Sequence, residues 1–248
     1  METLLTFTPS IPTFFLMFLF AYLFAFFVIF RNWSPKHRSE ASSCLMSLTH
    51  GTPAVIMATH AIIQAPTPRT FASPNVTGQN FVLEFSIAYF VVDLLHYMVF
   101  HPNDVLFIAH HLATLYVFVT CRYVVHHGAL AILVLLVLAE VTSACQNVRS
   151  LVSLMKADVP TAKKLYEFLS PPFYVFYSVS RGILGTFVVY KMGVFYASGA
   201  ANNMIPRWAW ISWMVVIVSA VLISILWVLN LWKEWYRERS HRAQKKVK

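Results

Sequence analysis

The chain has 248 residues, of which 58% are hydrophobic and 12% are charged, and its formal net charge is +9. A soluble domain carries about 25% charged residues, so this composition excludes an ordinary water-soluble fold and indicates a protein that buries its apolar surface in lipid. The basic residues lie in short segments between apolar stretches and in the C-terminal tail. This pattern is typical of membrane topology, and we expect no nucleic-acid partner.

Seven apolar segments have the length, about 17–25 residues, that a helix needs to cross a bilayer core of roughly 30 Å. They predict an all-α, polytopic transmembrane helix bundle of about seven spans. Six spans are the alternative, because polar residues crowd the end of the fifth segment. In chain order the segments are 11–30, 43–63, 82–100, 104–122, 127–148, 172–191 and 208–231.

The first segment is predicted to be a signal anchor. No basic residue precedes it and no small-residue cleavage site follows it, so it does not have the pattern of a cleaved signal peptide. We expect residues 1–35 to form this N-terminal span.

Lysine and arginine residues gather on one side of the predicted bundle. With seven spans and a cytosolic C-terminus, fourteen of them fall on the cytosolic side and four on the lumenal side, which places the N-terminus in the lumen. The sequon Asn75-Val76-Thr77 then falls in a lumenal loop, and Asn75 is a predicted glycosylation site.

The basic tail, residues 236–248, ends Lys245-Lys246-Val247-Lys248. Two lysines at positions three and four from the C-terminus resemble the dilysine signal that returns membrane proteins to the endoplasmic reticulum, so we expect a multi-pass protein of that membrane. The alternative is a basic juxtamembrane tail that only attracts anionic lipid.

Ionisable residues inside the third and fourth segments are the strongest functional signal. Asp93 and His96 are three residues apart and share a helix face, and the pair His110-His111 follows a short turn. The turn makes the two helices antiparallel neighbours, so all four groups are expected about 6–10 Å below the cytosolic boundary. Adjacent residues point about 100° apart on a helix, so only one histidine of the pair is expected to face a site.

The fifth and sixth segments add polar groups at a similar depth. Glu140, Ser143 and Asn147 form an i, i+3, i+7 stripe, and Arg181 lies in the cytosolic half of the sixth segment. Because ionisable groups in a membrane are costly and usually functional, we expect a shared polar pocket inside the bundle. The alternative is a purely structural buried pair, Glu140–Arg181 or Asp93–Arg181.

Metal and disulfide chemistry find no support in the spacing of histidines and cysteines. His96 and His101 match one histidine box of a membrane diiron enzyme, but nothing supplies the second box, so we expect no metal. The three cysteines, Cys44, Cys121 and Cys145, are irregularly spaced and are expected to pack as small residues.

Two strings resemble the TLC domain family, which includes the ceramide synthases. They are Tyr89-Phe90-Val91-Val92-Asp93-Leu94-Leu95-His96 and Ile108-Ala109-His110-His111-Leu112-Ala113-Thr114. The resemblance covers about residues 36–235 and implies a TLC domain there: a barrel-like bundle of six helices with a lipid-holding cavity, usually in the endoplasmic reticulum. The resemblance also implies that Thr114 belongs to the site.

Ceramide synthases carry H-D-x-x-D about 28 residues after the double histidine, whereas this chain reads Ala139-Glu140-Val141-Thr142-Ser143. Neither aspartate is present. The chain is more similar to the short TLC-domain proteins that are linked to membrane lipid composition.

Two functions remain open at this point. The first is a lipid-binding bundle that acts in lipid homeostasis, with His96, Thr114, Ser143, Asn147 and Arg181 as lipid-binding residues. The second is an acyl-CoA-dependent acyltransferase, in which His110 or His111 is the nucleophile and Asp93 or Glu140 orients it and takes up a proton. Neither function needs a cofactor; fatty acyl-CoA is a substrate only in the second.

Overall fold

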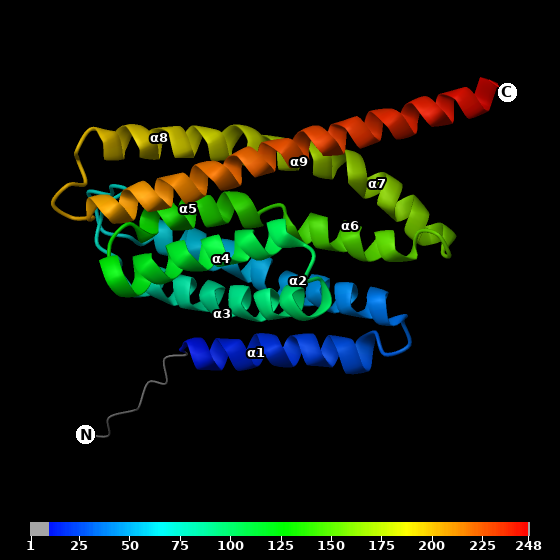
Figure 1. Ribbon diagram of the computed structural model, residues 1–248, viewed down its shortest axis with the longest axis horizontal. Coiled ribbons are helices and arrows are strands. Elements are labelled where there is room, and N and C mark those ends of the chain that lie inside the picture. The colour runs from blue at the N-terminus through cyan, green and yellow to red at the C-terminus, as the bar shows by residue number, and fades with distance from the viewer. Residues whose placement is uncertain (1–9, 248) are drawn as a thin grey trace. The chain divides into compact units, whose positions relative to one another are not determined.

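The computed structural model describes residues 10–247, and over this range every regular element is a helix, apart from an isolated bridge between Pro74 and His127. The predicted all-α fold is therefore confirmed (Figure 1). The η segments are π-helices that continue the preceding α-helix. In chain order the elements are α1 Ile11–Phe24, η1 Ala25–Ile29, α2 Pro35–Ile63, α3 Thr77–Phe100, α4 Val105–Val119, η2 Thr120–Val125, α5 Ala129–Glu140, α6 Ser143–Met155, α7 Pro160–Tyr177, η3 Ser178–Leu184, α8 Gly185–Ala197 and α9 Arg207–Val247.

Within the described residues, six helical stretches are long and apolar enough to cross a membrane. They are Ile11–Ile29, Thr77–Phe100, Val105–Val125, Ala129–Met155, Pro160–Ala197 and Arg207–Arg237. Helix α2 is 29 residues long but is not one of the six, because serine, threonine and histidine residues interrupt its apolar sequence. Of the seven predicted segments, the second, 43–63, is thus the one that is not apolar enough to count as a span. The fifth, which was expected to be the weakest, does count.

Several helices extend well past the apolar segments that predicted them. The sixth segment was predicted to begin at residue 172, but its helix begins at Pro160, which takes the first helical position after the extended Val159. Apolar residues mark the part of a helix that can lie in lipid, whereas backbone hydrogen bonds continue the helix into water until a turn residue ends it.

The described chain divides into two compact units, and the boundary along the sequence lies between Val137 and Leu138. In unit 1, α3 is the central helix: it packs against α1, α2 and α4, and most of its side chains are buried. The short turn from His101 to Asp104 reverses the chain between α3 and α4, as the sequence predicted, so these two helices run antiparallel side by side (Figure 1).

A second reversal in unit 1 joins η2 to α5. His126 adopts a left-handed conformation with φ 59°, and Gly128 has φ 90°. A histidine tolerates this region better than most side chains and a glycine has no Cβ to hinder it, so the two residues together turn the chain sharply.

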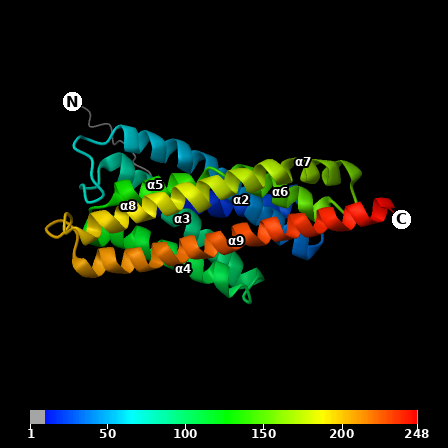
Figure 2. The ribbon, with the colours of Figure 1, turned by 90° about the horizontal axis from the view of Figure 1, so that it is seen from above.

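In unit 2, the elements α7, η3 and α8 form one continuous helical stretch that bends between α7 and α8 (Figure 1), and α9 runs alongside it (Figure 2). Helix α6 packs against α7 as a helical hairpin. The buried residues of this unit include Phe173, Tyr174 and Tyr177 of α7, against which Trp232 and Trp235 of α9 pack.

Candidate functional site

A buried polar contact in unit 1 joins Asp93 of α3 to His111 of α4. The distance from Asp93 Oδ2 to His111 Nε2 is 2.8 Å, and each residue is only 4% exposed. The His101–Asp104 turn positions the pair, because it sets α3 and α4 side by side with both residues on the facing sides. Two ionisable groups that were singled out from the sequence are therefore in direct contact.

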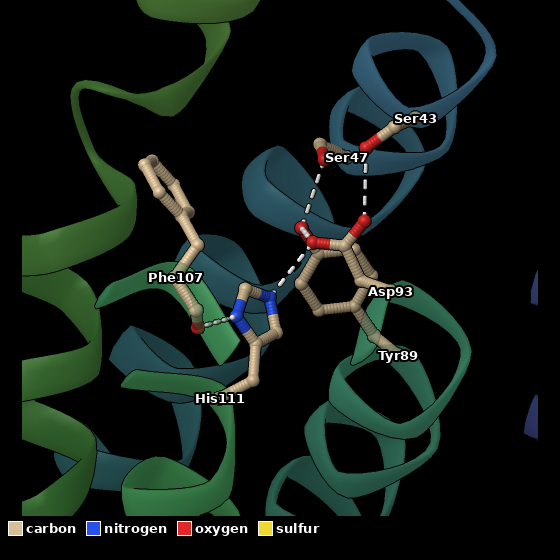
Figure 3. Close-up of polar contacts among 6 residues, drawn as sticks. All are labelled: Ser43, Ser47, Tyr89, Asp93, Phe107 and His111. Carbon is tan, nitrogen blue, oxygen red and sulfur yellow. Dashed lines mark hydrogen bonds and ion pairs between the residues drawn. The ribbon is translucent and has the colours of Figure 1, made fainter. Parts of the chain in front are cut away.

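Hydroxyl groups from two helices complete the surroundings of the Asp93 carboxylate (Figure 3). Ser43 of α2 donates to Oδ1 at 2.9 Å, and Tyr89, one turn before Asp93 on α3, donates to Oδ2 at 3.4 Å. Ser47 of α2 lies 2.8 Å from the Tyr89 hydroxyl. Because the Tyr89 proton is directed at Asp93, Ser47 is the donor in that bond. We call these five residues, Ser43, Ser47, Tyr89, Asp93 and His111, the Asp93 cluster.

Both ring nitrogens of His111 are engaged. Nδ1 lies 2.8 Å from the Phe107 carbonyl oxygen, which can only accept, so Nδ1 carries a proton. One more proton lies between Nε2 and Asp93, either on the ring or on the carboxyl group. The pair is net neutral in both cases, which avoids the large cost of an isolated charge in an apolar interior.

Aromatic side chains enclose the Asp93 cluster. The His111 ring centroid lies 5.5 Å from that of Phe90 and 5.4 Å from that of Tyr97. His50 of α2 is fully buried, with its ring stacked 3.9 Å from the Tyr89 ring and its Nε2 3.1 Å from Ser86 Oγ. In such surroundings hydrogen bonds are electrostatically stronger than in water.

His96 contacts α1 and not the Asp93 cluster. Its Nδ1 lies 3.0 Å from the hydroxyl oxygen of Tyr22, and both residues are buried. The sequence placed Asp93 and His96 on one helix face, and both side chains do point into unit 1, but each has a partner from a different helix.

The two histidines of the pair have different surroundings, as the 100° spacing predicts. His111 is buried against Asp93, whereas His110 is half-buried, with its ring centroid 5.7 Å from that of His111. Thr114, one turn further along α4 from His110, is also half-buried.

In unit 2 the predicted polar stripe spans a break between two helices. Helix α5 ends at Glu140 and α6 begins at Ser143, with a turn at residues 141 and 142. The Ser143 hydroxyl donates to Glu140 Oε2 at 2.6 Å, and Asn147 Nδ2 donates to the Ser143 carbonyl oxygen at 2.9 Å. The three residues are therefore linked, although they do not lie on one continuous helix.

Arg181 belongs to this second group. It lies in the π-helix η3, its guanidinium donates to the Ala139 carbonyl oxygen at 2.6 Å, and it stands 5.0 Å from the Tyr177 ring centroid. Arg181 thus holds the end of α5 next to Glu140. The sequence predicts that this group converges with the Asp93 cluster. The two groups belong to different units, so their convergence stays a prediction.

Asn75, the predicted glycosylation site, has a structural role in unit 1. Its Nδ2 donates to the Cys121 carbonyl oxygen and its Oδ1 accepts from the Ala129 backbone N–H, both at 2.9 Å. It therefore ties the loop before α3 to the first turn of η2 and the first residue of α5. Glycosylation at Asn75 stays a prediction.

Sequence reasoning missed four residues of these contacts: Ser43, Ser47, Tyr89 and Tyr22. Tyr89 could have been found, since it precedes Asp93 by four residues on the same helix face. The serines and Tyr22 are common residue types on other helices, and nothing in the sequence shows that those helices pack here. Among the side chains that the structure describes, residues 10–237 and 240, no three histidine, cysteine or carboxylate groups are gathered as they would be to hold a metal ion.

Comparisons with known proteins agree with the motif assignment. Residues 40–233 match the family described as the TLC domain. The chain is 56% identical to a TLC domain-containing protein of Arabidopsis thaliana over 245 residues, which is 97% of this chain and 96% of that protein. The match includes both strings around Asp93 and His111.

Proposed function

The chain belongs to the TLC domain family and is a multi-pass membrane protein, and we propose that it acts in membrane lipid homeostasis by holding the polar end of a lipid inside its helix bundle. The observation that carries this proposal is the buried contact between Asp93 and His111. Ionisable groups are rarely placed in membrane helices without a ligand, a pathway or a chemical step to serve.

The geometry of His111 argues against a nucleophilic role for this residue. In a catalytic Asp–His pair the carboxylate holds one ring nitrogen and leaves the other toward the reacting group. Here Nδ1 donates to Phe107 and Nε2 contacts Asp93, so neither nitrogen has a lone pair directed at a substrate. An acyl-imidazole on His111 would first require the contact with Asp93 to open.

Unit 2 carries a separate set of polar side chains that are suited to binding a lipid headgroup. Glu140, Ser143 and Asn147 supply acceptors and donors, and Arg181 supplies a cation. A guanidinium can bind a phosphate or carboxylate through two hydrogen bonds, so Arg181 is the residue we assign to an anionic headgroup.

The test compares lipid profiles of cells that express the wild-type chain, Asp93→Asn or Glu84→Gln at equal protein levels. Asp93→Asn keeps the volume of the side chain and removes its charge. Glu84 is the matched control, because it also lies on α3 and also pairs with a basic residue further along the chain, Arg122, at 2.7 Å. We expect Asp93→Asn to remove the effect of the protein on lipid composition and Glu84→Gln to retain it; equal profiles for all three would refute the proposal.

The acyltransferase alternative has a separate readout. Purified protein incubated with long-chain acyl-CoA gains the mass of one acyl group if an acyl-enzyme forms, and the adduct then maps to His110 or His111. We expect no adduct, together with co-purified lipid that is lost in Arg181→Gln. A stable adduct that disappears in His111→Ala would replace the binding proposal with the enzymatic one.

Residence in the endoplasmic reticulum is part of the same proposal and rests on Lys245 and Lys246. The backbone of both residues belongs to α9, while their side chains lie outside the described part of the chain.

A further inference from the structure

Helix α2 carries polar residues on two faces. Its inner face packs against α1 and α3, and three of its side chains, Ser43, Ser47 and His50, contact polar groups of α3. Its outer face is exposed and rich in threonine. From residue 44 to the end of the helix, the exposed residues are Thr49, Thr52, Ile56, Thr59, His60 and Ile63.

The outer face of α2 lies near the middle of the membrane. The His50 ring stacks on that of Tyr89 with centroids 3.9 Å apart, and Tyr89 lies at the middle of α3, which is a candidate span of 24 residues. Thr49 and Thr52 are within two residues of His50, so they are within about 3 Å of that depth. At this depth hydroxyl groups face hydrocarbon unless protein covers them.

Polar atoms on this face lack partners within the described part of the chain. Pro53 has no N–H, so the Thr49 carbonyl oxygen has no donor at the usual position four residues on. The Thr49 hydroxyl donates to the Met46 carbonyl oxygen at 2.6 Å, but the hydroxyls of Thr52 and Thr59 make no hydrogen bond to a described residue. Because unsatisfied polar groups are costly in hydrocarbon, this face needs a polar partner.

The exposed faces of α1 and α9 are different in character. They carry mainly large apolar side chains, among them Phe20 at 69% and Val215 at 63% exposure, as a lipid-facing surface does. On α2, threonines occupy half of the exposed positions, and this helix is not apolar enough to count as a span although it has 29 residues. A face that protein covers does not need to be apolar, which accounts for the low hydropathy of α2.

We propose that the outer face of α2 binds the same face of a second copy of this chain. The face consists of Thr49, Thr52, Ile56, Thr59 and Ile63. Their spacing alternates between three and four residues, so the face repeats every seven residues, as in a pair of helices that pack knobs into holes. No aspartate, glutamate, lysine or arginine occurs in residues 41–68, so two copies meet without repulsion between like charges.

Threonine is suited to a symmetric contact between two copies. A hydroxyl both donates and accepts, so a threonine can bond to its own counterpart, and its small side chain lets two helix backbones approach closely. Two copies in one membrane have the same orientation, so a two-fold axis along the membrane normal relates them and makes the two α2 helices parallel. Thr52 then meets Thr52 of the second copy, and Thr59 meets Thr59.

Cysteine cross-linking of the full chain in cell membranes tests this geometry. Thr52→Cys and Thr59→Cys are each expected to form a disulfide-linked dimer under mild oxidation, seen on a non-reducing gel as a band of twice the monomer mass. Phe20→Cys is the matched control, because Phe20 is an exposed residue of α1 in the same unit, and it is expected to stay monomeric. The wild type gives the background from its three native cysteines, which are buried or half-buried.

Three outcomes of the cross-linking contradict the proposal. They are the absence of a dimer at both threonine positions, an equal yield of dimer in Phe20→Cys, and a cross-link from position 52 or 59 to a different protein.

A second measurement tests the role of the hydroxyl groups. The dissociation constant of the dimer in lipid vesicles is measured by energy transfer between labelled copies of the full chain. Thr52→Val with Thr59→Val keeps the side-chain shape and is expected to raise this constant roughly eightfold, since each of two hydrogen bonds between membrane helices contributes roughly a threefold factor. Thr52→Ser with Thr59→Ser keeps the hydroxyls and is expected to dimerise like the wild type. A monomeric wild type, or a valine variant that dimerises equally well, overturns the proposal.

Discussion

Asp93 and His111 stabilise each other in surroundings where either charge alone would be costly. Both are buried, and they are 2.8 Å apart. Removing one partner of a buried pair leaves the other without compensation, which typically costs about 3–5 kcal/mol, whereas replacing both is much less harmful.

A double-mutant cycle at this pair tests that argument. His111→Leu is expected to lower the free energy of unfolding in detergent by about 3–5 kcal/mol, because Asp93 would keep only hydroxyl donors. Adding Asp93→Asn to His111→Leu is expected to recover part of this loss. Strictly additive effects would show that the two side chains do not interact. Glu84→Gln is the comparison; its ion pair with Arg122 is more exposed, so the expected loss is only about 1 kcal/mol or less.

The residues of the Asp93 cluster differ in how far the sequence revealed them. An aspartate and a double histidine in apolar helices are conspicuous, because charge there is rare. Whether His110 or His111 faces Asp93 depends on how α4 is rotated about its own axis. The geometry of the loop between α3 and α4 sets that rotation. Ser43 and Tyr22 became visible only when α2 and α1 were seen to pack on α3.

At the level of elements, the α6–α7 hairpin is held by one arginine. Arg149 makes three hydrogen bonds to α7 and stacks on the rings of Tyr166 and Tyr174. This arrangement uses the planar fork of a guanidinium, which lysine cannot imitate.

Arg149→Lys is therefore expected to loosen the hairpin although the charge is kept. The loss of two hydrogen bonds predicts a destabilisation of about 1–3 kcal/mol, seen as faster amide hydrogen exchange in α6. Lys156→Arg, at the residue that follows the last turn of α6, should leave the exchange rates unchanged. Equal protection in Arg149→Lys and wild type would mean that apolar packing alone holds α6 on α7.

The sequence predicted which segments form helices more readily than it predicted where each helix begins and ends. Each predicted apolar segment is helical over most of its length, since length and hydropathy are properties of the local sequence. The break between Glu140 and Ser143 was not predicted, because no glycine or proline marks it. In the structure, contacts from the next helix accompany the break: Ser180 and Arg181 of η3 donate to the carbonyl oxygens of Leu138 and Ala139, at the end of α5.

For the whole molecule, the glycosylation state of Asn75 reports on which side of the membrane the loop before α3 lies and which compartment the protein has reached. If the loop before α3 is lumenal, Asn75 carries a glycan, and the protein shifts in gel mobility after treatment with endoglycosidase H. Thr77→Val should abolish the shift; it removes the sequon and leaves the Asn75 bonds to Cys121 and Ala129 in place. Asn75→Gln would disturb those bonds and is the poorer variant.

The same assay tests retrieval to the endoplasmic reticulum. Lys245→Ala with Lys246→Ala is expected to make the glycan resistant to endoglycosidase H, because the protein then reaches later compartments. A glycan that stays sensitive in this variant would contradict the dilysine assignment and favour the basic-tail interpretation.

Local sequence properties determined the all-helical membrane class, the TLC family strings and the importance of Asp93 and the histidine pair. Each of these depends on residue type, hydropathy or spacing within a single segment. Only the tertiary structure decided that His111 and not His110 contacts Asp93, that serines of α2 join them, and that Tyr22 of the first span holds His96. Those contacts depend on how separate helices rotate and pack against one another, and no single segment encodes that relation.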